Sequence, residues 1–325
     1  MATLKDVASE SGLAVSTVSR ILNNRGYISD TAREKVDHAM AKLHYQPNEV
    51  ARSLCKKKSN TIGVIVPHIR HPYFAELISH LEAAAAKRKY KIILLNAREK
   101  AEKFSEYMDL CTSNRVNGII LCNGMVPTEK FLGTHIPVVT IERFLDEGTA
   151  SVECDNYEGG HLAAQELIGC GCKNLLHISG VSDMKMPAND RCRGFVEVCE
   201  QNGVSHREIS TSALQYHSEE YHAFLKRLFQ MYPETDGVFA SSDLIAAQIL
   251  QVCAWRGIAV PQQLKIVGFD DVSIARLTTP MLTTVHQPLK EMAETAVSLL
   301  LSAADGKLVV RKTVLPVSLI RRGTT

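Results

Sequence analysis

The sequence predicts a small all-α head followed by two α/β units, each built around a doubly wound parallel sheet. Two observations support this fold class. Short amphipathic segments separated by a glycine fill the beginning of the chain. From Thr61 onward, apolar β-branched runs such as TIGVIV (61–66) alternate with helical patterns, as buried parallel strands alternate with the helices that cover them.

The stretch LKDVASESGLAVSTVSRILN (4–23) predicts two short helices around a turn at Ser11-Gly12. Such a pair is typical of a helix-turn-helix. Its second helix leaves Arg20 facing outward among small side chains, and Arg20 has the donors to pair with guanine in a major groove. A helical bundle with an ordinary polar face is the alternative interpretation. The two apolar stripes are Leu4, Val7 and Ala8, and then Val18, Ile21 and Leu22.

A third helix should complete the head, capped by Ser29, or by Thr31 with Glu34 three places on. The segment NEVARSLCK (48–56) is long enough for about two helical turns, which are marginal in water without a partner surface. We therefore expect a hinge that becomes helical when it docks, followed by a solvated basic linker. The apolar stripe of the third helix is Ala32, Val36, Ala39, Met40 and Leu43.

Beyond residue 60 the chain runs twice through one α/β pattern, which predicts two lobes with a ligand cleft at the carboxyl ends of their strands. The first unit should contain strands at 61–66, 91–96, 118–122 and 137–141, a helix at about 74–88 and a helix ending at 114. The second should contain strands at 174–179, 237–241 and 265–269, and helices at about 160–170, 190–201, 218–231 and 243–256. A helix at about 289–304 and a β-rich tail at 309–320 follow.

The charge is small overall but unevenly placed. Residues 1–60 hold ten Lys/Arg against six Asp/Glu, a balance of +4, and the remaining 27 against 29 give −2. This distribution suits a chain that places its N-terminal part on a polyanion. No apolar run reaches about 18 residues and MATLKDVASE has no apolar signal core, so we expect a cytoplasmic protein without a membrane partner.

Metal and enzyme chemistry find little support in the sequence. The nine cysteines are scattered, which favours free structural thiols; Cys170 and Cys172 suggest a metal site, but no second ligand pair has usable spacing. The glycines around them follow a helix and do not form G-x-G-x-x-G, and the P-loop, G-x-S-x-G and H-E-x-x-H motifs are absent. We expect no metal, no cofactor and no catalytic residue. A Rossmann-like enzyme is a distant alternative.

Over essentially its full length, the chain resembles the lactose-repressor (LacI/GalR) family of bacterial transcription regulators. The resemblance rests on LKDVASESGLAVSTVSRILN, YQPNEVARSL, DNYEGG, GVFASSDLIA, VGFDD and TTVHQP, in that order. It implies a helix-turn-helix domain (1–46), a hinge helix and linker (47–59), and a two-lobed effector domain like that of periplasmic binding proteins. The implied crossings between lobes, near 155–156, 287–288 and 305–306, give a first lobe of 60–155 with 289–306 and a second of 156–288 with 307–325.

The resemblance also implies which residues contact DNA. Val15, Ser16 and Arg20 fall at positions that read bases, and Ala14 stands where the family often has a serine. Leu54 matches a hinge leucine that wedges between base steps in the minor groove, where partial unstacking permits a bend; packing against its own head is the alternative. The expected DNA-binding residues are Val15, Ser16, Thr17, Ser19, Arg20, Ala51, Arg52, Leu54 and Lys56.

In the cleft, Arg191 and Asp270 match the family's effector-binding arginine and acidic residue, and they suit the hydroxyls of a sugar. They are also placed to neutralise each other. Asp243 is alternatively a helix cap, and Ser242 stands where the family often has asparagine. The expected effector-binding residues are Tyr73, Phe74, Arg191, Tyr216, Ser242, Asp243 and Asp270.

These implications describe a repressor of a carbohydrate operon, most similar to sucrose-type repressors, that binds a pseudo-palindromic operator as a homodimer. The effector would be a sugar, or a sugar phosphate because His71 and Arg143 lie near the expected cleft. A sugar-binding transport protein with the same lobes is the alternative; the absence of a signal peptide and the DNA-reading head argue against it.

Overall fold

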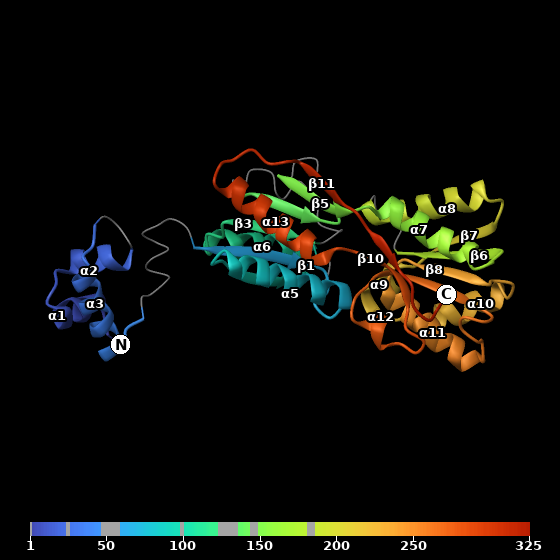
Figure 1. Cartoon of the computed structure of the whole chain (residues 1–325), viewed down its shortest axis with the longest axis horizontal. Coiled ribbons are helices and arrows are strands. Elements are labelled where there is room, and N and C mark those ends of the chain that lie inside the picture. Colours follow the sequence, from blue (N-terminus) through green and yellow to red (C-terminus); the bar gives the residue numbers. More distant parts are fainter. Residues whose placement is uncertain are drawn as a thin grey trace. The chain divides into compact units, whose positions relative to one another are not determined.

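The structure is a computed structural model that describes residues 2–23, 27–46, 59–97, 101–122, 136–143, 149–180 and 186–325. The chain divides into two units, Met1–Ser59 and Asn60–Thr325 (Figure 1). The first unit carries the predicted head, and the second carries both α/β lobes. No helix in the described ranges is both long and apolar enough to cross a membrane.

Local capping explains where the helices of the head begin and end. A capping box starts α1, because Thr3 accepts from the Asp6 backbone N–H while the Asp6 carboxylate accepts from the Thr3 N–H at 2.7 Å. Gly12, with φ +67°, ends that helix in the left-handed region that glycine adopts easily. Ser29, rather than Thr31, caps the third helix. The described helices are α1 (Leu4–Ser11), α2 (Val15–Leu22) and α3 (Asp30–Lys42).

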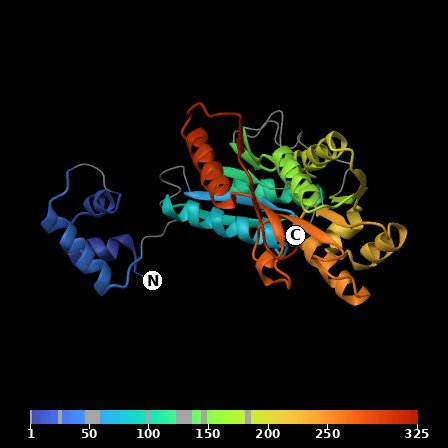
Figure 2. The same cartoon turned by 45° about the vertical axis from the view of Figure 1, so that its right-hand side comes forward.

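The first lobe is a parallel sheet in the order β11-β5-β4-β3-β1-β2. Its faces are covered differently, because Val64 of β1 belongs to the core beneath α5 and α13 while Ile65 belongs to the core beneath α6. α5 and α13 pack against each other, as Figure 2 shows. The strands are β1 (Thr61–Val66), β2 (Lys91–Asn96), β3 (Gly118–Leu121), β4 (Val138–Ile141), β5 (Ala150–Cys154) and β11 (Lys312–Leu315), and the helices are α5 (Pro72–Lys87), α6 (Ala101–Ser113) and α13 (Leu289–Ala304).

The second lobe repeats this plan with the strand order β12-β10-β9-β8-β6-β7, in which only the β10–β12 pairing is antiparallel. Phe239 packs on the α7–α8 side of the sheet and Val238 on the α10–α11 side. The strands are β6 (Asn174–Ser179), β7 (Ser205–Ser210), β8 (Gly237–Ala240), β9 (Lys265–Asp270), β10 (Thr283–His286) and β12 (Ser318–Ile320). The helices are α7 (Asn156–Gly169), the short 3-10 helix η2 (Pro187–Asn189), α8 (Asp190–Gln201), α9 (Ala213–Ser218), α10 (His222–Met231), α11 (Asp243–Arg256) and α12 (Ile274–Leu277).

The C-terminal tail differs from the expected lobe boundaries. The sequence placed 307–325 in the second lobe, but β11 pairs in parallel with β5 of the first sheet, and Lys312 forms an ion pair with Glu153 at 2.9 Å. Only β12 joins the second sheet. The third crossing between lobes therefore lies between Leu315 and Ser318 rather than near 305–306. The other two crossings run from β5 to α7 and from β10 to α13.

One expected helix also begins later than predicted, at His222 instead of Ser218. The segment 218–231 was expected to be continuous, but α9 ends at Ser218 and Glu219 adopts φ +59° before α10 begins at His222. A side-chain amide holds this break, because Gln248 of α11 accepts from the Tyr221 N–H and donates to the Glu219 carbonyl oxygen, both at 2.8 Å. β5, β7 and β10 are further elements that the sequence pattern did not predict.

Candidate functional site

The recognition helix of the head, α2, presents the expected face. Val18 and Ile21 are buried against the other two helices, which leaves Val15, Ser16 and Arg20 exposed along the opposite side. Thr17 and Ser19 are half-buried beside them. Ala14 precedes the helix and provides no side-chain cap, so the first backbone N–H groups of α2 are free of a side-chain acceptor from that position. Ala51, Arg52, Leu54 and Lys56 of the expected hinge lie outside the described residues.

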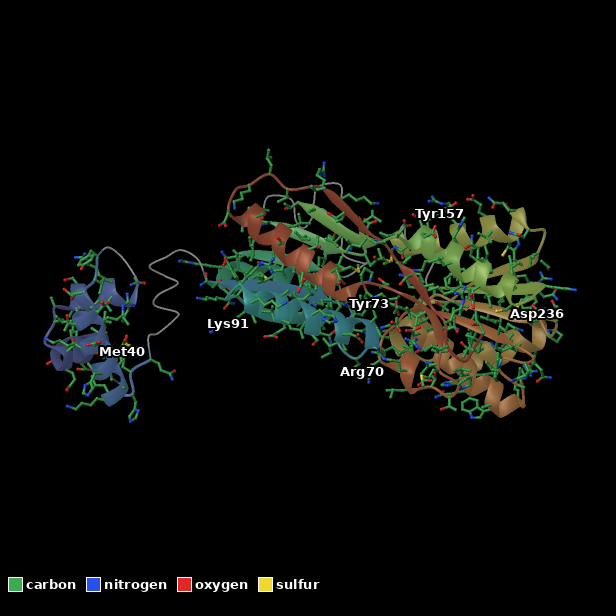
Figure 3. The ribbon with its side chains drawn as sticks, in the orientation of Figure 1. Met40, Arg70, Tyr73, Lys91, Tyr157 and Asp236 are labelled. Carbon is green, nitrogen blue, oxygen red and sulfur yellow. The ribbon has the colours of Figure 1, made fainter. Side chains whose placement is uncertain are left out.

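A cavity of about 350 Å³ lies between the two lobes. Its walls come from the start of α5 and the ends of β3 and β4 in the first lobe, and from α8 and the ends of β6, β8 and β9 in the second. This is where open α/β sheets bind ligands. Tyr73 and Arg70 lie at the end of the first lobe that faces the second (Figure 3). The predicted effector residues that line the cavity are Tyr73, Phe74, Arg191, Tyr216, Ser242 and Asp270.

Arg191 is the best-anchored polar group of the cavity. Its Nε donates to Asn156 Oδ1 and its Nη1 to the Ser241 carbonyl oxygen, both at 2.7 Å. The guanidinium lies 3.5 Å from the centre of the Phe269 ring, a cation–π contact, and Arg191 lines the cavity. Glu142 approaches from the first lobe, with its Oε2 3.9 Å from Nη2. Arg191 is thus held rigidly with part of its donor set still available.

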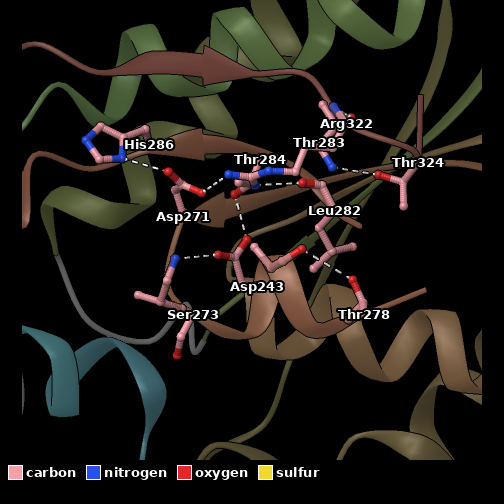
Figure 4. A network of polar contacts seen from close by, with 12 residues as sticks. Asp243, Asp271, Ser273, Thr278, Leu282, Thr283, Thr284, His286, Arg322 and Thr324 are labelled. Carbon is pink, nitrogen blue, oxygen red and sulfur yellow. Dashed lines mark hydrogen bonds and ion pairs between the residues drawn. The ribbon is translucent and has the colours of Figure 1, made fainter. Parts of the chain in front are cut away.

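Two neighbouring aspartates have different positions. Asp270 lines the cavity and accepts a 2.7 Å hydrogen bond from Gln287 Nε2. Burial raises the pKa of Asp270 to about 7, against the opposing effect of Arg191. Asp243 does not line the cavity: its carboxylate is fully buried and accepts from Thr284 Oγ1 at 2.6 Å and the Val272 N–H at 3.0 Å (Figure 4). Burial, with Asp270 nearby, raises the pKa of Asp243 as well.

Asp243 therefore ties α11 to β10 and is not positioned to contact a ligand directly. The cap of α11 is Ser242, whose Oγ accepts from the Ile245 N–H at 3.3 Å. In the same network, Asp271 accepts from Arg322 at 2.5 Å and lies 3.0 Å from His286 Nδ1 (Figure 4). These contacts fix the β9 and β10 ends that place Asp270.

Aromatic side chains form the apolar part of the cavity. Tyr73 and Phe74 contact each other edge to face at 5.0 Å between ring centroids, and Tyr216 and Tyr221 contribute from the second lobe. The Tyr73 hydroxyl is buried and has no hydrogen-bond partner among the described residues. A buried hydroxyl in this state is ready to bond a polar ligand. Aromatic walls with a few converging polar groups are typical of a small-molecule site.

Comparison with known proteins identifies the family. Residues 3–48 match the family described as "Bacterial regulatory proteins, lacI family", and residues 164–325 match the "Periplasmic binding protein-like domain". The chain is 36% identical to a protein named ribose operon repressor from Halalkalibacterium halodurans, over all of this chain and 97% of that protein. The chain belongs to the lacI family of bacterial regulatory proteins. A protein named sucrose operon repressor from Pediococcus pentosaceus is 35% identical, with 98% of each chain covered.

Solved structures agree with this lacI-family assignment. A periplasmic binding protein/LacI transcriptional regulator from Alkaliphilus metalliredigens, complexed with D-xylulofuranose, has a TM-score of 0.74 and 31% identity, covering 82% of this chain and 99% of that one. The lac repressor dimer bound to operator and the anti-inducer ONPF has a TM-score of 0.87 at 24% identity, covering 99% and 98%. The chain is therefore a DNA-binding regulator of transcription rather than an enzyme, and the predicted fold class is confirmed.

Three polar residues at the cavity of this lacI-family regulator were not among the effector-binding residues predicted from the sequence. Glu142, Asn156 and Gln287 each contact Arg191 or Asp270, and Glu142 and Gln287 line the cavity. Asn156 stands in DNYEGG and Gln287 in TTVHQP, segments that were recognised as lobe crossings. A polar residue at a crossing is close to both lobes, and that position was a usable signal. Glu142 directly follows the buried strand β4, and a polar residue at the carboxyl end of a parallel strand was also a usable signal.

Proposed function

We propose that this regulator represses a carbohydrate operon and that a small sugar bound in the interlobe cavity controls its affinity for the operator. The observation that carries the proposal is the combination of Arg191, Asp270 and aromatic walls in one cavity, in a chain that also has a helix-turn-helix head. Guanidinium and carboxylate groups pair with sugar hydroxyls, and aromatic faces pack on the apolar side of a sugar ring. The names of the relatives, ribose and sucrose operon repressor, agree with this class of effector.

The size of the cavity favours a monosaccharide. Its volume of about 350 Å³ stands near the lower limit of the roughly 300–1,000 Å³ typical of ligand sites. The ribose operon repressor is one of the similar relatives, and the structural relative with 31% identity was crystallised with a five-carbon sugar, D-xylulofuranose. We therefore infer that a pentose fits this cavity better than a disaccharide such as sucrose.

The DNA side of the proposal follows from symmetry. Two copies of the chain would present two α2 helices to successive major grooves of a pseudo-palindromic site, with Arg20 reading bases. The hinge would place Leu54 in the minor groove between the half-sites. Leu54→Ala should then reduce the bend that the protein imposes on operator DNA, measured by fluorescence resonance energy transfer between the duplex ends. An unchanged bend would remove Leu54 as a wedge.

The main experiment measures operator binding and sugar binding together. The tightest duplex is selected from a random pool with the full chain, and its affinity is then measured at fixed salt with and without D-ribose, D-xylulose, D-fructose and sucrose. One sugar should change the affinity, within the roughly 5- to 150-fold range usual for allosteric coupling. The operator must change that sugar's affinity by the same factor. The enantiomeric L-sugar is the control. A selected site without two-fold symmetry, or equal affinity with every sugar, would refute the proposal.

A further inference from the structure

The ionisable side chains that face the cavity are mostly acidic among the residues that the structure describes. Among the described residues that line it, Glu142, Glu208 and Asp270 are acidic, and Arg191 is the one arginine or lysine. His71 adds no positive charge near neutral pH, because burial lowers its pKa to about 4. Its Nδ1 accepts from the Tyr73 N–H at the start of α5, as a neutral imidazole does. Arg143 does not line the cavity.

The positive charge of Arg191 is already matched by Glu142. Both side chains are largely withdrawn from solvent, with 8% of Arg191 and 12% of Glu142 exposed, so solvent screens their attraction weakly. Asn156 connects them, because its Oδ1 accepts from Arg191 Nε while its Nδ2 donates to Glu142 Oε2 at 2.9 Å. An anion that approached Arg191 would therefore meet a carboxylate fixed beside it.

The backbone around Glu142 holds that carboxylate in place. Glu142 follows β4 with φ +53°, a conformation uncommon for any residue with a side chain. Its Oε1 accepts from the Cys154 N–H at 2.6 Å, which anchors it to the end of β5. Glu142 comes from the first lobe and Arg191 from the second, so the pair forms across the cavity itself. Burial raises the pKa of Glu142, while Arg191 and the two hydrogen bonds oppose this.

Building on the proposed sugar effector, we propose that Glu142 is the specificity-determining residue that makes the cavity accept uncharged sugars and reject their phosphate esters. A phosphate group brings about −1.5 to −2 charges at pH 7. Inside the cavity it would lose its hydration shell, and among the described lining residues it would gain no unmatched cation in return. A neutral sugar avoids this cost, because its hydroxyls can accept from the Arg191 guanidinium and donate to the Asp270 carboxyl.

The test compares matched neutral and phosphorylated sugars by isothermal titration calorimetry on the full chain. The pairs are D-ribose with D-ribose 5-phosphate, D-fructose with D-fructose 6-phosphate, and D-glucose with D-glucose 6-phosphate. Wild type should bind one neutral sugar at least about 100-fold more tightly than its phosphate ester, because placing the phosphate beside the Glu142 carboxylate in a buried site is costly. Glu142→Gln removes the charge and nearly keeps the shape, but its amide has one acceptor oxygen and therefore retains only one of the two acceptor contacts. It should narrow the neutral-to-phosphate affinity ratio about ten-fold or more.

Two further variants separate charge from shape. Glu142→Asp keeps the negative charge in a shorter side chain and should keep the preference for the neutral sugar even if both ligands bind more weakly. Glu153→Gln removes another buried carboxylate of the first lobe, one that pairs with Lys312 and does not line the cavity. Glu153→Gln should therefore have the same neutral-to-phosphate affinity ratio as wild type. A thermal melt of each variant confirms that it is folded.

The outcomes distinguish this proposal from the proposed function. Wild type that binds a phosphate as tightly as its parent sugar, or a Glu142→Gln variant with the wild-type ratio, overturns the role of Glu142 and leaves a sugar-controlled repressor intact. A wild-type chain that binds no sugar in either form overturns the sugar effector, and the role of Glu142 with it. Both proposals are supported if wild type strongly prefers the neutral sugar over its phosphate and this preference falls in Glu142→Gln but not in Glu142→Asp or Glu153→Gln.

Discussion

Replacing Gly160 with alanine should displace Arg191 of the effector cavity through its backbone, without changing any residue that lines the cavity. Gly160 lies on α7 where α8 crosses, and a Cβ built there would stand 2.0 Å from the Arg191 carbonyl oxygen. Real Cβ atoms essentially never come closer than 3.0 Å to another heavy atom, so the two helices must separate by about 1 Å. The obstacle is backbone rather than a flexible side chain, and it cannot be removed by a rotamer change.

The size of the effect follows from this displacement. Overpacking of this kind costs about 1–3 kcal/mol, which for a domain of this size lowers the melting temperature by about 2–12 °C. The Arg191 hydrogen bonds to Asn156 and Ser241 are 2.7 Å long, and a movement of about 1 Å breaks them. Because a hydrogen bond to a charged group contributes about 1.5–3 kcal/mol, effector affinity should fall about ten-fold or more.

Gly169→Ala provides the matched control on the same helix. A Cβ at Gly169 meets nothing within 4 Å, and its φ is not positive, so the substitution should stabilise the chain by up to about 1 kcal/mol through helix propensity. Thermal denaturation and calorimetric titration with the effector sugar measure both variants. If Gly160→Ala melted with wild type and bound the sugar equally well, the close approach of α7 and α8 could not be what positions Arg191.

Three other predictions concern the head and the cavity. Arg20→Ala should cost about 1–3 kcal/mol of operator affinity and relax one base position in each half-site; uniform weakening on all sequences, measured by fluorescence anisotropy at fixed salt, would make Arg20 a phosphate contact. Thr3→Ala should destabilise α1 by about 1 kcal/mol through loss of its cap, visible as faster amide exchange in 4–11 of the full chain, and unchanged exchange would contradict the capping role. Burial raises the pKa of Asp270 from 3.8 to about 7, so the folded chain holds a proton that the unfolded chain releases, and the stability from this carboxyl is lost as pH rises from about 4 through 7. In Asp270→Asn, the free energy of unfolding measured with urea should depend less on pH between about 4 and 7. If the variant kept the wild-type pH dependence, another group would be responsible for it.

Sequence reasoning succeeded where structure is decided locally. The apolar stripes of the head helices are set by residues only a few places apart, so α2 and its exposed Arg20 were predictable even though Ala14 provides no side-chain cap. Buried parallel strands such as β1 are continuous apolar runs, which were equally easy to recognise. The position of the cavity was predicted in outline because open α/β sheets bind ligands at the carboxyl ends of their strands. The lining residues Tyr73, Arg191 and Asp270 were predicted from the resemblance to the family.

The errors arose where contacts between distant segments decide the outcome. The sequence of β11, KTVL, gives no indication of which sheet it will join, and its pairing with β5 corrected the lobe boundary. β7 is mostly exposed and lacks the apolar pattern of the other strands, so it was missed. Asp243 is adjacent to the lining residue Ser242, yet it turns toward Thr284 and away from the cavity. The partnership of Glu142 with Arg191 joins residues of different lobes and has no signature within either segment.

The crossing of the tail between the sheets affects how the chain can fold during synthesis. Residues 312–315 complete one edge of the first sheet and residues 318–320 complete one edge of the second. A ribosome that releases the chain from its N-terminus therefore leaves β5 and β10 without their outer partner strands until this segment has emerged. The head needs only its own helices and is free to fold early. Nascent chains should thus have a folded helix-turn-helix head before either lobe has all its strands. The need for chaperones should be greatest during this interval.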